Sequence, residues 1–250
     1  MTSAYRIASF TERPDQIDAA HAIIDAGWPN FMLKHRVAVE RRATCLEIFT
    51  DTQYMLLSTD DTIMAVANTV PVVWDGRSES LPPEGHDAMF QQAVHNHAQG
   101  IEPTALCALS ITVHPDYLGQ GFSFRAIRAV KAATAARGFS ALIIALRPTL
   151  KPRYVLTPME RYIHWQREDG EPFDPWLRVH RRFGAEVVGV CPRSRRIEGS
   201  VAEWETWTDM RFPESGTYVV PGALVPIDID CEQDHGLYVE PNVWIVHSAE

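Results

Sequence analysis

The sequence predicts an α/β protein of the α+β type, in which helices flank a mixed central sheet. An apolar run at residues 105–113 is followed by a glycine-rich turn and by a helical pattern that runs without proline or glycine to residue 137. Residues 140–146 form a second uninterrupted apolar run, which suits a central strand parallel to the first. A strand, a helix and a strand in this spacing predict a right-handed crossover.

Upstream of this unit, the pattern predicts a strand and two helices. Residues 5–10 read as the strand, and Pro14 opens a helical stretch that should stop near Gly27. Its apolar positions fall on one face, at Ile17, Ala20, Ile23 and Ile24. After an aromatic turn at residues 28–31, residues 33–49 resume helical character. The side chains predicted to point inward there are Val37, Leu46 and Phe49.

A hairpin and a third helix come next. Residues 54–58 and 63–73 are predicted strands separated by Asp60-Asp61. A polar loop at residues 75–83 leads to a predicted helix at residues 86–99, which carries His95 and His97. Two imidazoles spaced in this way point apart on a helix and have no third ligand at useful spacing, so no metal site is expected.

The chain changes character after residue 146. Four prolines and several charges at residues 147–174 indicate a structured excursion, and residues 176–183 predict a short helix that ends at Gly184. Residues 185–190 read as a strand. Beyond Pro192 we expect extended chain, including Trp204 and Trp207, and a last apolar segment at residues 243–246. We expect one domain over residues 1–250, with a core at 1–192 and a C-terminal elaboration at 193–250.

Composition narrows the function classes. The chain has 250 residues, is 46% hydrophobic and carries a formal net charge of -9, which disfavours nucleic acid and anionic membrane surfaces as partners. Charged residues near the N-terminus argue against a signal peptide, and no window approaches the about 20 apolar residues of a membrane span, so a cytoplasmic protein is expected. The four cysteines lie far apart and are expected to be small, buried or half-buried apolar residues: Cys45, Cys107, Cys191 and Cys231.

The glycine turn is the strongest functional signal. A turn of this kind leaves backbone N–H groups unpaired at the positive end of a helix dipole, which is a ready site for a phosphate or pyrophosphate. The surrounding segment YLGQGFS, with its strand, helix and following strand, resembles the acyl-CoA-binding motif of the GNAT (GCN5-related N-acetyltransferase) superfamily. The order of the preceding elements agrees with this resemblance.

The resemblance implies a GNAT fold with about six to seven strands and an acyl-CoA co-substrate. The family motif is Gln or Arg, two residues, Gly, one residue, then Gly or Ala, and it falls here on Leu118, Gly121 and Ser123, so two of its three places depart from the usual pattern. By the same resemblance the strand would hold the pantetheine through Leu109, Ile111 and Val113. The turn would hold the pyrophosphate through Leu118, Gly119, Gln120, Gly121, Phe122 and Ser123.

A second match lies in HRRFGAEVVGV, residues 180–190. Many GNAT members place a tyrosine four residues before a glycine at this point, where it protonates the leaving coenzyme A thiolate; here His180 precedes Gly184. A histidine can donate a proton near neutral pH, so His180 is the candidate general acid. The alternative is a histidine on a solvated basic helix face, flanked by Arg178, Arg181 and Arg182.

The long C-terminal part, with His180 in place of the tyrosine, is similar to the GNAT-like domains that load polyketide pathways. Those domains decarboxylate malonyl-type thioesters and pass the acyl group to a carrier protein, and the similarity implies roles for His180 and Thr149. Three hypotheses follow: acyl transfer from acetyl-CoA or another acyl-CoA to an amine, decarboxylation of malonyl- or methylmalonyl-CoA with transfer to an acyl carrier protein, and a non-catalytic acyl-CoA-binding module. Trp28 is the aromatic residue best placed to shape the acceptor side.

Overall fold

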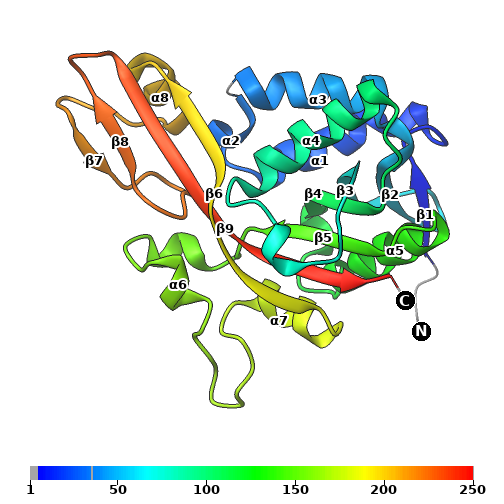
Figure 1. Ribbon diagram of the computed structural model, residues 1–250. Coiled ribbons are helices and arrows are strands. Elements are labelled where there is room, and N and C mark those ends of the chain that lie inside the picture. Colours follow the sequence, from blue (N-terminus) through cyan, green and yellow to red (C-terminus); the bar gives the residue numbers. More distant parts are fainter. Residues whose placement is uncertain (1–4, 35, 250) are drawn as a thin grey trace.

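The computed structural model describes residues 5–34 and 36–249, and its central feature is a mixed nine-stranded sheet (Figure 1). The strand order is β1-β2-β3-β4-β5-β9-β8-β7, and β6 pairs along β9. Among the strand pairs of these described residues, only β4 and β5 are parallel. The predicted class is confirmed, with more strands than the six to seven expected. The strands are β1 Tyr5–Ser9, β2 Gln53–Ser58, β3 Ile63–Val72, β4 Ala105–Val113, β5 Ala141–Leu146, β6 Glu186–Gly199, β7 Gly216–Tyr218, β8 Ile227–Asp230 and β9 His235–Ser248.

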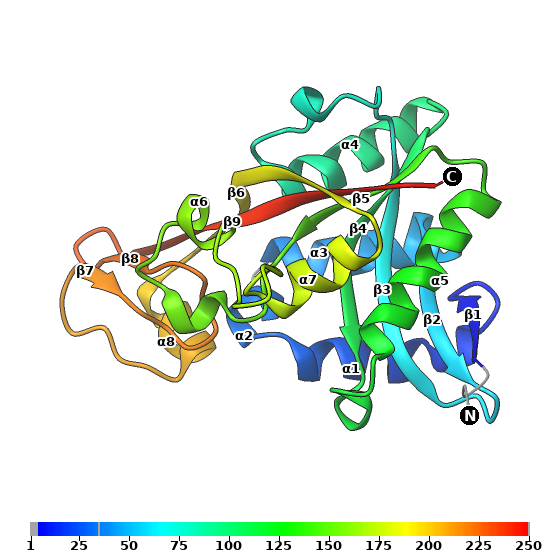
Figure 2. The same ribbon diagram turned by 90° about the horizontal axis from the view of Figure 1, so that it is seen from below.

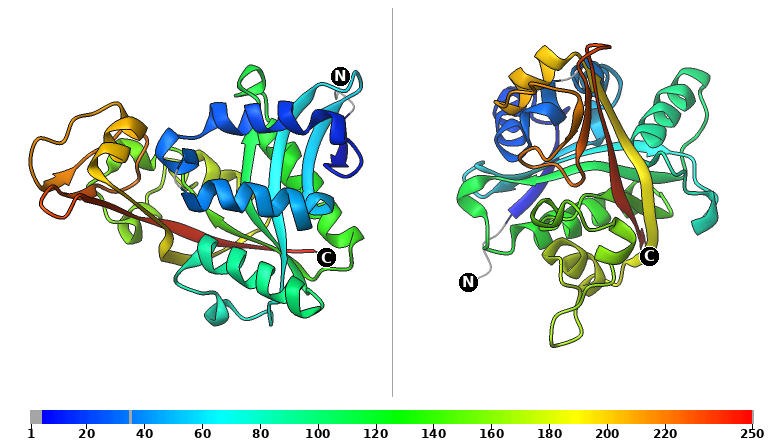
Figure 3. Two further views of the ribbon diagram at one scale, coloured as in Figure 1. Left: turned by 90° about the horizontal axis from the view of Figure 1, so that it is seen from above. Right: turned by 90° about the vertical axis from the view of Figure 1, so that its left-hand side faces the viewer.

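Helices cover both faces of the sheet. One face carries α1, α3 and α4, and the other carries α5, α6 and α7 (Figures 1 and 3). Within residues 5–34 and 36–249, no helix combines the length and the apolar character needed to cross a membrane. The helices are α1 Ile17–Gly27, α2 Asn30–Lys34, α3 Arg36–Ile48, α4 Gly85–Gln99, α5 Phe122–Ala136, α6 Met159–Tyr162, α7 Pro175–Arg182 and α8 Val201–Thr208.

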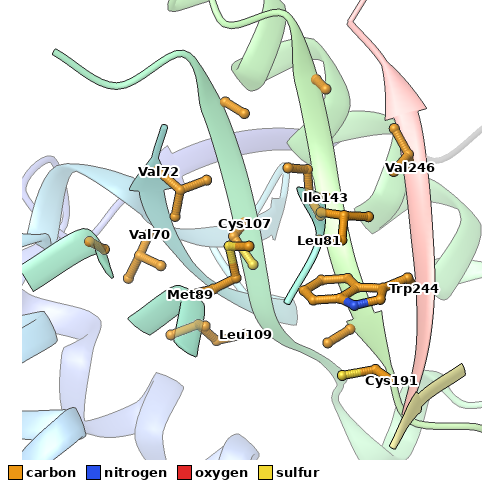
Figure 4. Packing of buried hydrophobic residues seen from close by; sticks show 14 of the residues in the cluster. Val70, Val72, Leu81, Met89, Cys107, Leu109, Ile143, Cys191, Trp244 and Val246 are labelled. Carbon is orange, nitrogen blue, oxygen red and sulfur yellow. The ribbon is translucent and has the colours of Figure 1, made fainter. Parts of the chain in front are cut away.

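The apolar runs predicted as central strands bury both of their faces. In β4, Cys107 joins a cluster with Met89 of α4, whereas its neighbour Leu106 joins a cluster with Val130 of α5. Successive side chains of a strand point to opposite faces, so an uninterrupted apolar run fits a strand covered on both sides. Figure 4 shows the first cluster, in which Trp244 of β9 lies beside the strand that carries Ile143.

The C-terminal part forms an arm that projects from the rest of the molecule. Strands β6 and β9 pair along most of their length and carry β7, β8 and α8 to one end of the molecule, where α2 is the neighbouring helix (Figures 1 and 2). Trp204 lies at the centre of a separate core there, and Phe31 of α2 packs against it with the ring centroids 5.7 Å apart. The other end of β9 pairs with β5 on one side and with β6 on the other, so this strand lies inside the sheet.

Several sequence predictions need correction. The segment around Trp204 and Trp207 is the helix α8 rather than extended chain, and Ser200 and Glu203 close a reciprocal capping box at its start. Val37 is 41% exposed and does not point inward. Cys231 is also exposed, unlike the other three cysteines. The strands predicted at 185–190 and 243–246 are correct in type and much longer in the structure. The turn expected at 28–31 ends earlier, because α2 begins at residue 30.

Candidate functional site

A cleft opens where β4 and β5 separate. The two strands pair only from Leu106 to Ala108 and from Leu142 to Ile144, although β4 continues to Val113 and β5 to Leu146. The cleft has a volume of about 680 Å³. Many of the predicted site residues line this cleft. They are Trp28, Leu109, Ile111, Val113, Leu118, Gly119, Ser123, Thr149 and His180.

A β-bulge marks the point where the cleft begins. Asn68 of β3 pairs with Ser110 and Thr69 pairs with Ala108, so Leu109 is the extra residue. The Leu109 carbonyl oxygen lies 3.0 Å from Nε2 of His86 and accepts a hydrogen bond from Nη2 of Arg195 at 3.1 Å. Because a guanidinium nitrogen of Arg41 lies 3.1 Å from Nδ1 of His86 and can only donate, Nε2 of His86 carries the hydrogen. The bulge carbonyl is therefore held by two donors.

The glycine turn presents free amides at the start of α5. Gly119 and Gly121 have φ angles of +74° and +79°, a conformation that glycine adopts without strain. No partner within the described chain accepts from the amides of Gly121, Phe122 or Ser123. Three N–H groups at a helix start attract an anion.

The side chains of the turn divide into two groups. Leu118, Gly119 and Ser123 line the cleft. Gln120 turns back and donates to the Asp116 carbonyl at 2.8 Å, and Phe122 is buried beneath α5. The lining residues of the cleft do not include Gln120, Gly121 or Phe122. Their predicted role therefore depends on backbone groups alone.

His180 is completely buried and lies in the cleft wall. Its helix α7 begins at Pro175 and is capped by Asp174, whose carboxylate accepts from the amide of Trp176 at 2.9 Å. Nδ1 of His180 lies 2.8 Å from Nε2 of His247 on β9, and Nε2 of His180 has no partner among the described residues. The alternative of a solvated basic helix face is wrong, because His180 points away from its arginine neighbours into the protein.

Both imidazoles of this pair are neutral at neutral pH. Burial, helped by the neighbouring His247, lowers the pKa of His180 to about 3, and burial with the nearby Lys131 lowers the pKa of His247 to about 4. A neutral imidazole carries one hydrogen, so one ring donates to the other in the 2.8 Å contact. When His247 is the donor, the hydrogen of His180 sits on Nε2, the nitrogen without a protein partner.

The pair predicts a stability loss in mild acid. Below pH of about 6.5 the unfolded chain protonates both histidines, while the folded chain keeps them neutral until pH of about 4 for His247 and about 3 for His180. The unfolded state then binds more protons, so the free energy of unfolding falls by about 1.4 kcal/mol per pH unit for each histidine. Urea unfolding at pH 7 and pH 5 should show a smaller difference in the double variant H180F/H247F than in the parent. Equal differences would contradict this assignment.

Two arginines flank Trp28 in the cleft. The indole Nε1 of Trp28 donates to Oγ1 of Thr112 at 3.0 Å, which fixes the ring, and the guanidinium carbons of Arg195 and Arg147 lie 5.2 and 5.8 Å from its centroid. Arg147 forms an ion pair with the buried Glu240 at 2.9 Å. The sequence prediction missed Arg147, Arg195 and His247. Of the other tryptophans, Trp176 also lines the cleft, whereas Trp165 lines a different cavity.

Metal ligands do not converge in the part of the chain that the structure describes. No group of three or more His, Cys, Asp or Glu side chains there could hold a metal ion. His95 and His97 are both exposed on α4.

The chain resembles known proteins in both sequence and structure. No family model matches the chain. An arginine N-acetyltransferase, avaD, of Aspergillus versicolor is 31% identical over an alignment that covers 97% of this chain and 93% of that protein. The loading GNATL domain of CurA from Lyngbya majuscula has the same fold, with a TM-score of 0.62 at 16% identity and 98% of both chains covered. The GphF GNAT-like decarboxylase, solved with isobutyryl-CoA, gives a TM-score of 0.57 at 20% identity, covering 99% of this chain and all of that one.

Proposed function

Since the chain belongs to the GNAT superfamily of acyltransferases, we propose that it transfers an acetyl group from acetyl-CoA to an amine. One observation carries this proposal. The cleft between β4 and β5 joins a helix start with free amides to a buried imidazole whose Nε2 has no protein partner. The amides suit the pyrophosphate of coenzyme A, and the imidazole suits the sulfur that leaves as a thiolate.

In the proposed reaction the amine loses a proton and the leaving sulfur gains one. The amine nitrogen attacks the thioester carbon, the C–N bond forms, and the C–S bond breaks with its electron pair on sulfur. The neutral His180 donates a hydrogen bond from Nε2 to that sulfur as charge develops on it, and the proton that the amine loses passes through water to the sulfur, which leaves as the free thiol. His247 acts through His180, because its Nε2 hydrogen, donated to Nδ1 of His180, keeps the hydrogen of His180 on Nε2, the nitrogen without a protein partner. His247 is thus a positioning residue.

The relative from Aspergillus versicolor makes L-arginine the first acceptor to test. That protein is named an arginine N-acetyltransferase, and it aligns with nearly the whole of this chain. Trp28 is proposed to shape the acceptor side, since its ring borders both the cleft and a second, smaller cavity.

A second candidate is decarboxylation of malonyl- or methylmalonyl-CoA with S-acyl transfer to an acyl carrier protein. The observation in its favour is that Thr149 and His180 line the same cleft. The fold is also shared with GphF, a GNAT-like decarboxylase. This candidate requires release of carbon dioxide in the absence of any amine.

We further propose that residues 1–250 act as one domain. Strand β9 belongs to the predicted elaboration at 193–250, yet it pairs with β5 of the predicted core at 1–192. Its Glu240 also binds Arg147 at the end of β5. Removal of the elaboration would therefore take away part of the cleft wall.

Product analysis separates these functions. The protein is incubated with acetyl-CoA and L-arginine, and separately with malonyl-CoA and a phosphopantetheinylated carrier protein, and the products are identified by mass spectrometry. We expect acetylarginine and an equal amount of free coenzyme A in the first reaction. Carbon dioxide and an acylated carrier protein in the second reaction alone would favour the decarboxylase. Tight binding of acetyl-CoA without turnover of any amine or carrier protein would favour the non-catalytic module.

A further inference from the structure

Arg195 is a buried arginine without a carboxylate partner among the described residues. It lies on β6, directly after the second bulge of that strand, and only 9% of its surface is exposed. Its guanidinium donates to the uncharged carbonyl oxygen of Leu109 and forms no ion pair within residues 5–34 and 36–249. Burial, with the nearby charge of Arg41, lowers the pKa of Arg195 to about 10, so the side chain still carries its charge at neutral pH.

The two nearest carboxylates are engaged elsewhere. Glu240 accepts from Arg147 at 2.9 Å and from the Tyr238 hydroxyl at 2.6 Å. Asp87 accepts from Arg41 at 2.7 Å and from the amide of Arg196 at 2.9 Å. A buried charge without a counter-ion is costly to the folded state. A site that keeps such a charge is suited to an anionic ligand.

Arg195 also occupies the border between two cavities. It lines the cleft, together with Trp28 and Leu109, and the same three residues line a smaller cavity of about 80 Å³ that extends toward α1 and α3. The smaller cavity contains two more arginines, but Arg41 is paired with Asp87 and Arg42 with Asp25. Arg195 is therefore the cation there that lacks a carboxylate partner within the described chain.

We infer that Arg195 binds a carboxylate of the acceptor, so that the acceptors of this enzyme are amines that carry a free carboxylate, as amino acids do. The inference rests on the proposed N-acetyl transfer. A guanidinium binds a carboxylate through two parallel hydrogen bonds. The acetyl group is uncharged, and the pyrophosphate of coenzyme A has its own donors at the glycine turn. The smaller cavity has room for a carboxylate and its neighbouring atoms, since one water takes about 30 Å³ of liquid volume.

Matched acceptors test this inference. Each amino acid is compared with the amine that lacks only the carboxylate: L-arginine with agmatine, L-lysine with cadaverine, and L-ornithine with putrescine. Hydrogen bonds to charged groups predict that kcat/KM for the best amino acid exceeds that of its amine by about 10- to 100-fold. In R195Q the ratio should fall to near one, mainly through a higher KM for the amino acid.

A binding measurement removes the dependence on turnover. L-arginine at millimolar concentration should raise the melting temperature of the parent, and agmatine should not. R195M should melt no lower than the parent, because a charge without a counter-ion has been removed and His86 still donates to Leu109. Its melting temperature should not respond to L-arginine. R147M is the matched control, since it leaves Glu240 without its cation and should melt several degrees lower.

The outcomes separate failure of the inference from failure of the proposed function. Equal kcat/KM values for the amino acids and their amines in the parent would overturn the inference and leave N-acetyl transfer standing. No turnover of any amine would count against the proposed function, while the melting shifts would still decide whether Arg195 binds a carboxylate. R195Q could instead weaken the binding of malonyl-CoA relative to acetyl-CoA and leave the kcat/KM ratio of amino acid to amine unchanged. In that case Arg195 would bind the carboxylate of the acyl group, and the inference would be wrong.

Discussion

Replacing His180 by phenylalanine is expected to lower kcat for acetyl transfer by about 100- to 1,000-fold, the usual range for loss of one hydrogen-bond donor to a charge that develops in the transition state. Phenylalanine keeps an aromatic ring in the buried space, where the His180 ring lies 4.9 Å from the ring of Trp176. It removes only the two nitrogens, and with them the hydrogen bond that we propose Nε2 donates to the leaving sulfur. The rate is measured as coenzyme A release at saturating acetyl-CoA, and the fold of the variant is checked by circular dichroism.

Two comparisons sharpen this prediction. H247F should lower kcat less than H180F, because it frees the His180 ring without removing its Nε2. H95F makes the same chemical change on the exposed surface of α4 and should leave kcat within about twofold of the parent. A well-folded H180F protein with the kcat of the parent would show that His180 does not assist departure of the sulfur.

The pH profile gives an independent reading of the same residue. A histidine with an ordinary pKa of about 6.5 would impose an inflection on kcat near that pH. Burial lowers the pKa of His180 to about 3, so the imidazole stays neutral throughout the range from pH 5 to pH 8. We therefore expect that His180 adds no inflection to the pH profile of kcat. Any inflection near pH 6.5 in the parent should also be present in H180F.

Local sequence patterns predicted the centre of the molecule well. Alternating or continuous apolar runs predicted the strands β2 to β5, and two glycines predicted the turn before α5. In the structure both glycines have positive φ angles. These features depend on neighbours in sequence, which is why they can be read without a structure. The resemblance noticed at this turn is confirmed at the level of the superfamily by the 31% identical relative.

The missed residues depend on pairing between distant segments. His180 meets His247 across 67 positions of sequence, and Arg195 meets Leu109 across 86. Arg195 lies in a polar part of β6 beyond the predicted strand at 185–190, and His247 is brought to α7 by the position of β9 in the sheet, so neither contact follows from a local sequence pattern. One local signal was present and overlooked: Ser200 followed by Glu203 is a capping-box sequence, and it begins α8.

Glu240 is expected to contribute more to stability than any exposed acidic residue of the chain. Its fully buried carboxylate accepts hydrogen bonds from Arg147 at 2.9 Å, from the Tyr238 hydroxyl at 2.6 Å and from Nδ2 of Asn242 at 3.0 Å. Glu240→Ala leaves a largely buried guanidinium without its counter-ion, and breaking a buried pair in this way costs about 3–5 kcal/mol. Urea unfolding at pH 7 measures the loss.

The double variant R147M/E240L distinguishes a buried ion pair from simple packing. Removing both charges leaves neither one unpaired, so the double variant should recover much of the stability that E240A loses. Glu198 is the matched control: it pairs with Arg196 at 2.6 Å, but its side chain is 47% exposed, and E198A should cost no more than about 1 kcal/mol. Equal losses in E240A and E198A would contradict the assignment. Because Glu240 holds Arg147 beside Trp28, E240A should also weaken acceptor binding, which would link the end of the chain to the cleft.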